Sequence, residues 1–538
     1  MTGLTHEVTN QPPPLVGHDV FGTDRALVEA VERYAGPDHL PGLTALGSRA
    51  GSEEAQRWGV EANANPPVLR THDRYGHRVD EVDFHPSWHA LMDVAVGAGL
   101  HAAAWSAGAG GHVRRAAGFV VWSQVEAGHG CPVSMTYAAV PALRSDPALA
   151  AVWEPGLSAT TYDPGLRAPA AKAGLLAGMG MTEKQGGSDV RANTTRAEPL
   201  VADGEYLLTG HKWFCSAPMC DLFLVLAQAP GGLTCFVVPR VLPDGSRNTF
   251  RLQRLKDKLG NRSNASSEVE LDGTWAQRLG AEGRGVRTII EMVSATRLDC
   301  VLGSTALMRQ AVAQATHHAA HRRAFGGLLA DKPLMQNVLA DLTVESEAAT
   351  ALALRLADAF DSGERGLRRL AVAVGKYWVC KRAPTVVGEA LECLGGNGYV
   401  EESGLPRLYR EAPLNSIWEG SGNVNALDVL RALAREPAAV EALQAEVALA
   451  RGADRRLDAA ADRLGKDLVT ADEGSARRLV ESMALVLQGS LLVRHSPGYL
   501  ADAFCASRLA GDHGQALGTL PAGLDTAAIV ARATPALP

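Results

Sequence analysis

Residues 416–423, with the sequence SIWEGSGN, place one carboxylate, that of Glu419, beside an aromatic side chain and two glycines. A carboxylate in such surroundings can lose part of its hydration, which raises its pKa and suits it to take a proton from carbon. The alternative for the same residues is a capping box that starts a helix with an acidic first turn. This segment alone leaves both interpretations open, and two further segments favour the first.

The first of these segments is residues 179–190, MGMTEKQGGSDV. Glycine lets the main chain approach a ligand closely, and clustered N–H groups with Thr and Ser hydroxyls can hold phosphates and the polar edges of a flavin. The second is residues 322–327, RRAFGG, which the glycine corner 394–399, LGGNGY, follows later in the chain. An Arg can pair bidentately with a pyrophosphate. The alternative for these arginines is a solvated helix face.

The composition is that of a mostly helical globular protein, since 46% of the 538 residues are hydrophobic and only 5% are aromatic. A chain of this length can hold three or more domains with buried cores. Its formal net charge of −7 does not suit the chain as a whole to a nucleic-acid backbone. The eight cysteines include no C-x-x-C pair, so we expect reduced, mostly buried thiols rather than a zinc ribbon or a disulfide framework.

Several other sites and locations find no support in the sequence. The first residues lack the basic and apolar regions of a signal peptide, and no apolar run reaches the roughly 18 residues that span a bilayer. We therefore expect a cytoplasmic protein without a membrane partner. Neither the Rossmann nor the P-loop glycine pattern occurs. His317 and His321 lack the H-E-x-x-H pattern, so we expect no metal site.

The spacing of apolar residues predicts a mostly α-helical chain with a central β domain. Helices are expected at the stretches 26–34, 119–125 and 307–321. Strands are expected at the short apolar runs bounded by turn residues, which are 206–208, 222–226, 235–238 and 269–271. We expect four regions, which are an N-terminal arm and helical domain (1–177), a β-rich domain (178–280), a helical domain (281–434) and a C-terminal helical domain (435–538).

Five segments, taken in order, resemble the acyl-CoA dehydrogenase family between about residues 60 and 432. They are the loop 181–190, the tryptophan segment 211–216, the segment 257–263, the R-x-x-F-G segment 322–326 and the E-G-[ST] segment that contains Glu419. The resemblance implies a helical domain, a β-barrel-like domain and a helical bundle, here with a C-terminal helical extension. It also implies an FAD-binding homotetramer that removes two hydrogens from the α and β carbons of an acyl-CoA thioester.

The same resemblance implies roles for individual residues. Glu419 is the implied base for the α proton, while a hydride passes to the flavin. Arg322 and Phe325 are implied to reach the FAD of a neighbouring subunit. The other residues implied to contact FAD are Met181, Thr182, Gln185, Gly187, Ser188, Trp213, Ser216, Gly395, Gly396, Ile417, Trp418, Ser421 and Asn423.

One branch of the family, the AidB branch, resembles this sequence more closely. It contains flavoproteins of the bacterial adaptive response to DNA alkylation. The segments 180–190, 256–266 and 406–410 and the opening residues 10–12 are similar to it. This resemblance implies binding of double-stranded DNA through the C-terminal helices and protection against alkylation damage. It also implies a weak, isovaleryl-type acyl-CoA dehydrogenase activity.

The C-terminal region itself is not basic, since residues 435–538 hold 11 Lys/Arg and 13 Asp/Glu. Pairs of arginines can still form a local cationic stripe, for which the alternative is i,i+4 ion pairing on a wet helix face. The candidate DNA-binding residues are Arg431, Arg455, Arg456, Arg477 and Arg478.

Two positions depart from the family pattern, and a third differs from that of some relatives. Cys215 stands where the family commonly has a Thr two residues after the flavin tryptophan, and a thiol is a weaker donor than a hydroxyl. Glu392 replaces a Gln before the glycine corner, where a carboxylate would repel a pyrophosphate unless it is protonated or turned away. Thr296 occupies the position, just before Arg297, at which some relatives carry the base, which leaves Glu419 as the candidate base.

The sequence leaves three other functions open. One is a metabolic dehydrogenase of short or branched acyl-CoA, which the intact Glu419 favours. Another is a flavin oxidase of small alkylating or nitro compounds, to which no residue points. The last is a non-enzymatic role in which the flavin only orders the fold.

Overall fold

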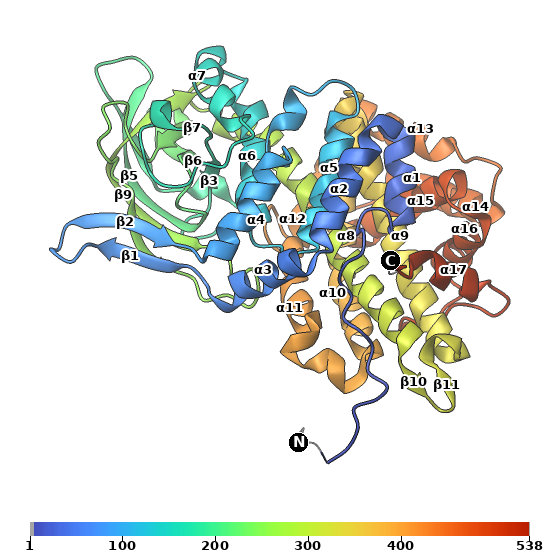
Figure 1. The fold of residues 1–538 in the computed structure, drawn as a ribbon. Helices are drawn as coiled ribbons and strands as arrows, with labels where there is room; N and C mark the ends of the chain where they lie inside the picture. Colours follow the sequence, from blue (N-terminus) through green and yellow to red (C-terminus); the bar gives the residue numbers. More distant parts are fainter. Residues whose placement is uncertain (1–4, 537–538) are drawn as a thin grey trace. The chain divides into compact units, whose positions relative to one another are not determined.

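The computed structural model describes residues 5–536, which form two compact units (Figure 1). The first unit combines the residues up to 53 with 301–416 and those from 425 onward, and it is mainly helical. The second unit combines residues 54–300 with 417–424 and contains helices and a β domain. The expectation of a mostly α-helical chain with a central β domain is therefore confirmed.

Helices open the second unit. Asp146 caps the last of them by accepting hydrogen bonds from Ala148 N and Leu149 N. Nearly every residue of the third and fourth is buried, because small and apolar side chains cover most of their circumference. Of the apolar run 119–125, expected to be helical, residues 119–123 form the end of the third and 124–125 lie in the turn after it. In order, these helices are α3 (Glu53–Ala64), α4 (Pro86–Gly97), α5 (Gly111–Ser123), α6 (Gly130–Leu143) and α7 (Pro147–Leu157).

A hairpin of β1 (Val68–His72) and β2 (Arg78–Asp83) has no counterpart in the sequence prediction. Its residues are mostly exposed or half-buried and carry charges on both faces, so they show no apolar alternation. Cross-strand ion pairs take the place of apolar contacts, since the Arg70 guanidinium donates to Asp83 at 2.6 Å and to Glu81 at 3.2 Å.

The β domain of the second unit is a seven-stranded sheet in the order β3-β6-β4-β5-β9-β7, with β8 paired to β9. Because β6 also pairs with β7, the ring of strands closes, which agrees with the β-barrel-like domain expected from the sequence. The runs 222–226 and 235–238 form its most deeply buried strands. The strands are β3 (Ala177–Gly180), β4 (Arg196–Pro199), β5 (Glu205–Ser216), β6 (Leu222–Ala229), β7 (Gly232–Pro239), β8 (Arg251–Leu255) and β9 (Ser266–Leu279).

Long helices build the first unit. Three of them are α8 (Gly285–His321), whose residues up to 300 belong to the second unit, α9 (Pro333–Asp361) and α10 (Arg365–Cys393). The stretch 26–34, expected to be helical, lies in the first of the shorter ones. These are α1 (Arg25–Tyr34), α2 (Leu40–Ala50), α11 (Leu405–Glu411) and α12 (Gly422–Arg435).

The C-terminal residues pack on the same long helices. They form α13 (Pro437–Ala448), α14 (Arg455–Thr470), α15 (Ala476–His495), α16 (Gly498–Phe504) and α17 (Thr526–Ala533). In the first unit, α13 and α15 pack on α10, while α1, α15 and α17 pack on α9 (Figure 1). The expected C-terminal helical extension is thus present, and it shares its core with α9 and α10.

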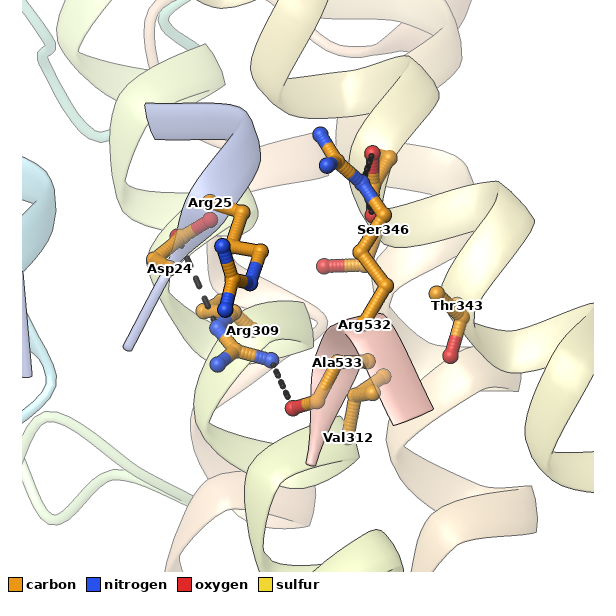
Figure 2. A pocket seen from close by; sticks show the side chains of 9 residues that line it. Asp24, Arg25, Arg309, Val312, Thr343, Ser346, Arg532 and Ala533 are labelled. Atoms are coloured by element: carbon orange, nitrogen blue, oxygen red, sulfur yellow. Dashed lines mark hydrogen bonds and ion pairs between the residues drawn. The ribbon is translucent and has the colours of Figure 1, made fainter. Parts of the chain in front are cut away.

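A buried arginine of the first unit, Arg309, connects the residues just before α1 to α17 (Figure 2). Arg309 on α8 donates at 2.8 Å to the carbonyl of Ala533 in α17 and at 2.8 Å to the carbonyl of Thr23, just before α1. It also pairs with the buried Asp24 at 3.5 Å. Next to it, Arg532 of α17 donates at 2.8 Å to Glu347 of α9. These contacts fix α17 by directional bonds as well as by packing.

Three general findings concern residues 5–536. No helix in this range has both the length and the apolar character needed to cross a bilayer. No group of His, Cys, Asp and Glu side chains in it is arranged to hold a metal ion. All eight cysteines are buried and none forms a disulfide, so the expected burial of the thiols is confirmed.

Candidate active site

Glu419 lies in a left-handed turn immediately before α12. Its φ is 56°, and that of the following Gly420 is 96°. A non-glycine residue in this region of backbone space carries strain, and such residues cluster at functional sites. Helix α12 begins only at Gly422 and has no acidic residue in its first turn, so the capping-box interpretation does not hold for Glu419.

Two consecutive residues of α8 hold Glu419 by its side chain and by its main chain. The Thr296 hydroxyl lies 2.6 Å from Glu419 Oε2, a distance typical of a hydrogen bond to an ionised carboxylate. Arg297 Nε donates to the main-chain carbonyl of Glu419 at 3.1 Å. Since Thr296 and Arg297 are both buried, the carboxylate has a defined position relative to α8.

A buried ion pair anchors this turn of α8 to α5. Arg115 on α5 donates from Nη2 to Asp299 Oδ2 at 2.8 Å and from Nε to the carbonyl of Leu100 at 2.7 Å. Its guanidinium also lies 4.0 Å from the centre of the Tyr137 ring. These contacts hold the guanidinium in place, so α8 is fixed at Asp299, two residues after Arg297.

A cluster of polar side chains from α6 and the β domain also interacts electrostatically with the carboxylate of Glu419. Burial raises the pKa of the Cys131 thiol to about 11, and the charge of Glu419 adds to the rise. Lys258 donates to Ser266 Oγ at 3.0 Å, and the Ser216 hydroxyl lies 3.2 Å from the same oxygen. Near neutral pH the thiol is therefore protonated, and Lys258 is the cation of this cluster.

The glycine-rich loop after β3 is held by a second buried ion pair. Lys212 donates from Nζ to Glu183 at 2.8 Å, and the exposed fractions of the two side chains are 1% and 0%. Glu183 also accepts from the N–H groups of Thr194 at 2.7 Å and Thr195 at 3.1 Å. Burial acts to raise the pKa of Glu183, but Lys212 and these hydrogen bonds lower it to about 2. The ionised carboxylate of Glu183 therefore holds the loop in place.

The other polar groups of the loop lie near its surface. Gln185 Nε2 donates to Asn193 Oδ1 at 3.1 Å, and Asn193 in turn donates to the carbonyl of Met181 at 2.9 Å. A Cβ atom at Gly187 would lie 2.6 Å from Thr182 Oγ1, so this position requires glycine or a shift of the Thr182 side chain. Gly187 and the next residue, Ser188, are exposed.

A β-bulge in β5 sets the orientation of Trp213. Lys212 pairs with Val269 and Cys215 pairs with Ser267 of β9, so two residues of β5 oppose one of β9. As a result, Lys212 and Cys215 both face the core. Of the two residues between them, Trp213 is half-buried and Phe214 is exposed. The main-chain N–H of Trp213 donates to the carbonyl of Thr182 at 3.0 Å, which ties the tryptophan to the loop.

The family departure at Cys215 has a structural explanation. The Cys215 thiol is buried and donates to the carbonyl of Met179 at 3.8 Å, within the sheet. Burial raises its pKa to about 12. Ser216, one residue later, is half-buried and carries the hydroxyl that faces the polar cluster of Lys258. The hydroxyl available in this strand is thus displaced by one residue from the family position.

The segment around Glu419 carries four more candidate residues of the second unit. Ile417 is 63% exposed, Trp418 and Ser421 are half-buried, and Asn423 is exposed. Together with the loop and the tryptophan, these residues give the second unit an acidic group, hydroxyls and an aromatic ring.

The remaining flavin candidates lie in the first unit. Arg322 follows α8 directly and donates to the carbonyl of Asn10, so it is not on a solvated helix face. Phe325 occupies the tip of a hairpin formed by β10 (Arg323–Ala324) and β11 (Gly327–Leu328), with φ at 50° and 93% exposure. Gly395 and Gly396 are exposed after the end of α10, as is Glu392 within it.

The five arginines proposed for DNA differ in their surroundings. Arg456 pairs with Asp454 at 2.6 Å and with Asp502 at 2.7 Å, and neither pair has the i,i+4 spacing of the ion-pairing alternative. Arg477 donates to the Tyr377 hydroxyl at 3.2 Å. Within residues 5–536, no ion pair is formed by the other three, Arg431, Arg455 and Arg478, which are all exposed.

The residues of the second unit fit FAD. Its flavin needs donors for the polar edge of the ring and an aromatic wall, and its pyrophosphate needs N–H and hydroxyl groups. Thr182, Ser188 and Ser216 supply hydroxyls and Trp213 supplies the ring. The main chain at Gly186 is open, since a Cβ there would touch nothing within 4 Å.

Several residues that build this site were not predicted from the sequence as functional. They are Thr296 and Arg297, which hold Glu419, Lys258 in the polar cluster, and the Lys212–Glu183 pair beneath the flavin loop. One signal was available for the pair, because a lysine inside an otherwise apolar strand requires a buried partner. The partners of Glu419 carry no such signal, because they lie more than a hundred residues away in sequence.

A helical domain, a closed β barrel and a helical bundle, with a strained carboxylate between glycines and an aromatic ring, define the acyl-CoA dehydrogenase class. Models of this family match the chain as "Acyl-CoA dehydrogenase, middle domain" at residues 178–274 and "Acyl-CoA dehydrogenase, C-terminal domain" at 283–434. Residues 10–164 match the "Adaptive response protein AidB N-terminal domain". The chain belongs to the acyl-CoA dehydrogenase family of FAD-dependent oxidoreductases.

Its relatives include the putative acyl-CoA dehydrogenase AidB of Escherichia coli K12, which is 47% identical over 93% of this chain and 94% of its own. Acyl-CoA dehydrogenase family member 11 of Caenorhabditis elegans is 31% identical over 84% of this chain and 80% of its own. The crystal structure of C. elegans ACDH-11 in complex with C11-CoA superposes with a TM-score of 0.87 at 27% identity, over 94% of both chains. The similarity to the AidB branch is thus confirmed.

Proposed function

We propose that this protein is an FAD-dependent acyl-CoA dehydrogenase in which Glu419 takes the α proton of a thioester. The observation that carries the proposal is that Glu419 is hydrogen-bonded at two points. Thr296 bonds its carboxylate, and Arg297 bonds its main-chain carbonyl. A base that removes a proton from carbon must be fixed in direction, because the reaction depends on near-attack geometry. The strained left-handed turn at Glu419 serves this requirement.

The remaining parts of the second unit support the reaction. When bound, FAD accepts the hydride that leaves the β carbon. We propose that Trp213, Ser216 and the hydroxyls of the loop 181–190 hold the flavin, with Ile417, Trp418, Ser421 and Asn423 beside it. The Lys212–Glu183 ion pair keeps that loop in place without contacting the ligand.

The proposed substrate is an acyl-CoA thioester, since a thioester carbonyl makes its α proton acidic when its oxygen accepts hydrogen bonds. Isovaleryl-CoA is the thioester that the AidB resemblance suggests. The C11-CoA bound in the ACDH-11 structure adds a longer chain to the substrates worth testing.

The test is anaerobic reduction of the purified flavoprotein by isovaleryl-CoA and by undecanoyl-CoA, followed through the loss of flavin absorbance. We expect Glu419→Gln to abolish reduction and Glu473→Gln, an exposed glutamate between α14 and α15, to leave it unchanged. Reduction that persists in Glu419→Gln would refute the role of Glu419. If neither thioester reduces the flavin, oxygen consumption with nitroalkanes tests the oxidase alternative.

We also propose that the hairpin of Arg322 and Phe325 contacts a neighbouring subunit and its FAD in a homotetramer. The left-handed backbone of Phe325 is costly for a non-glycine residue, and a partner surface against its 93% exposed side chain would offset that cost. Light scattering after gel filtration tests this proposal. We expect Phe325→Ser to lower the mass and the flavin content, whereas Tyr75→Ser, at an exposed turn of the other unit, should change neither.

A second proposed activity is binding of double-stranded DNA, by which the protein would limit alkylation damage as the AidB resemblance implies. One specific observation favours it. Lys381 of α10 and Arg477 of α15 lie 5.6 Å and 5.9 Å from the centre of the same Tyr377 ring. Partial burial and the neighbouring charges of Arg477 and Lys376 lower the pKa of Lys381. A phosphate here would relieve this repulsion, although Glu481 already acts on Arg477.

Point variants test DNA binding better than a truncation does, because removal of residues 435–538 would expose the buried faces of α9 and α10 on which these residues pack. We expect duplex DNA to bind more weakly as salt rises, and the double variant Lys381→Gln/Arg477→Gln to reduce the salt slope by about two. The matched control is Arg451→Gln, because Asp458 and Asp462 already neutralise this arginine. An unchanged affinity in the double variant would exclude this surface.

A further inference from the structure

The hydroxyl of Thr296 lies between two acceptors. Its Oγ1 is 2.6 Å from Glu419 Oε2 and 3.1 Å from the main-chain carbonyl of Val293, one turn earlier in α8. A hydroxyl has one hydrogen to donate and two lone pairs that accept. It can therefore donate to only one of the two oxygens at a time, and the protonation state of Glu419 decides which.

An ionised carboxylate can only accept, so the Thr296 hydroxyl donates to it, and this charge-assisted bond is the stronger of the two. A protonated carboxyl group can donate, and the hydroxyl can then accept from it while its own hydrogen turns to the carbonyl of Val293. Such back-bonding to a carbonyl of the preceding turn is ordinary for threonine in a helix. The second arrangement applies when the transferred proton lies on Oε2, and it is reached by rotation of the two O–H bonds. When the proton lies on Oε1, the Thr296 hydroxyl goes on donating to Oε2.

We propose that Thr296 is a positioning residue that keeps the carboxyl group of Glu419 hydrogen-bonded both before and after it takes a proton. The proposal rests on the proposed role of Glu419 as the base. A base that is hydrogen-bonded in only one of its two protonation states is fixed in direction only in that state. With Thr296, the same oxygen keeps its partner throughout, and Arg297 keeps the main chain fixed meanwhile.

The surroundings make the hydroxyl the adjustable part of this arrangement. Thr296 is buried, and the Arg115–Asp299 pair anchors the same part of α8, so the helix does not move to follow the proton. Two other titratable groups near Glu419 are Arg297, which bonds its carbonyl, and Cys131 of α6. Lys258 acts on Cys131 in turn. The thiol remains protonated near neutral pH, so it does not compete for the transferred proton.

The test compares the flavin-loaded wild-type protein with Thr296→Val, which keeps the shape but removes the hydroxyl, and Thr296→Ser, which retains it. One readout needs no reaction: infrared difference spectra across pH, in which the carboxyl band of Glu419 is identified by its loss in Glu419→Gln. We expect Thr296→Val to raise the apparent pKa of that band by about one unit, and Thr296→Ser to restore it.

The second readout is the rate of flavin reduction by isovaleryl-CoA and by undecanoyl-CoA. We expect Thr296→Val to slow reduction about 10- to 100-fold with little change in substrate affinity, and Thr296→Ser to recover most of the rate. An unchanged carboxyl band in Thr296→Val, with Glu419→Gln inactive, would overturn the role of Thr296 alone. Full activity in Glu419→Gln would overturn the proposed function and this role with it.

Discussion

Arg297 donates a hydrogen bond from Nε to the main-chain carbonyl of Glu419 at 3.1 Å, so a side chain of α8 stabilises the strained left-handed turn that carries the carboxylate. A guanidinium offers its donors in a rigid planar fork, which a flexible ammonium does not reproduce. The contact is to the main chain, so it orients Glu419 without sharing its proton.

We therefore expect Arg297→Lys to slow flavin reduction by acyl-CoA roughly 10- to 100-fold, because a base displaced by about 1 Å loses its near-attack geometry. Stopped-flow reduction at saturating thioester measures this rate. Arg287→Lys is the matched control, since Arg287 is exposed on the same helix. A normal rate in Arg297→Lys would show that the turn does not depend on this contact.

The ion pair beneath the flavin loop gives a prediction about stability. Lys212→Met leaves Glu183 buried without its cation, and breaking a buried pair in this way costs about 3–5 kcal/mol. The double variant Lys212→Met/Glu183→Gln removes the charge and should recover part of the loss. Urea unfolding of the three proteins measures the difference. A single variant as stable as the double one would show that the pair does not hold the loop.

The same pair predicts an acid limit for the loop. The folded-state pKa of Glu183 is lowered from its ordinary value of 4.5 to about 2, by Lys212 and by hydrogen bonds that outweigh burial. A lowered carboxylate pKa gives stability that is complete above pH 4.5 and is lost as pH falls towards 2. Flavin fluorescence should therefore rise over this range in the wild type. In the double variant that lacks Glu183, this step should be missing.

The long elements of the fold could be predicted from the sequence because their patterns are local. The period of apolar residues identified α1, the end of α5 and four strands of the barrel. The β1–β2 hairpin could not be predicted in this way, because cross-strand charges rather than an apolar face hold it. The four-domain division stays a prediction, since the chain separates into two compact units that interleave along the sequence.

The candidate site was predictable only where chemistry follows from a short motif. The segment around Glu419 and the loop 181–190 stand out by their glycines, carboxylate and hydroxyls. The displaced hydroxyl at Ser216 depends on a bulge in β5, which the sequence does not reveal. Likewise, Thr296 and Arg297 reach Glu419 only through the tertiary fold, so no local pattern could connect them.

Ser216 and Cys215 should therefore differ in their effect on the flavin. We expect Ser216→Ala to weaken FAD binding about 10-fold and to shift the visible absorbance of the bound flavin, because a hydroxyl donor is lost. Cys215→Ala should leave the spectrum unchanged and lower only the thermal midpoint, since its thiol is buried within the sheet. The reverse result would place Cys215 at the flavin.

The end of the chain depends on one buried guanidinium, which leads to the last prediction (Figure 2). Arg309→Met removes two hydrogen bonds, to the carbonyls of Thr23 and Ala533, and leaves Asp24 buried without its cation. We expect hydrogen exchange in α17 to accelerate at least 10-fold and the protein to lose about 3–5 kcal/mol of stability near pH 7.

The loss of stability in Arg309→Met should be smaller at low pH. Burial raises the pKa of Asp24 even with Arg309 present, and without the arginine it rises further, so the carboxyl is readily protonated in the folded state. A raised carboxyl pKa favours the folded state at low pH and destabilises it as pH rises, hence Arg309→Met should come closer to the wild type at pH 5 than at pH 8. Arg25→Met is the matched control, because Arg25 lines the same pocket but is exposed. Equal losses at both pH values would show that the buried charge of Asp24 is not the cause.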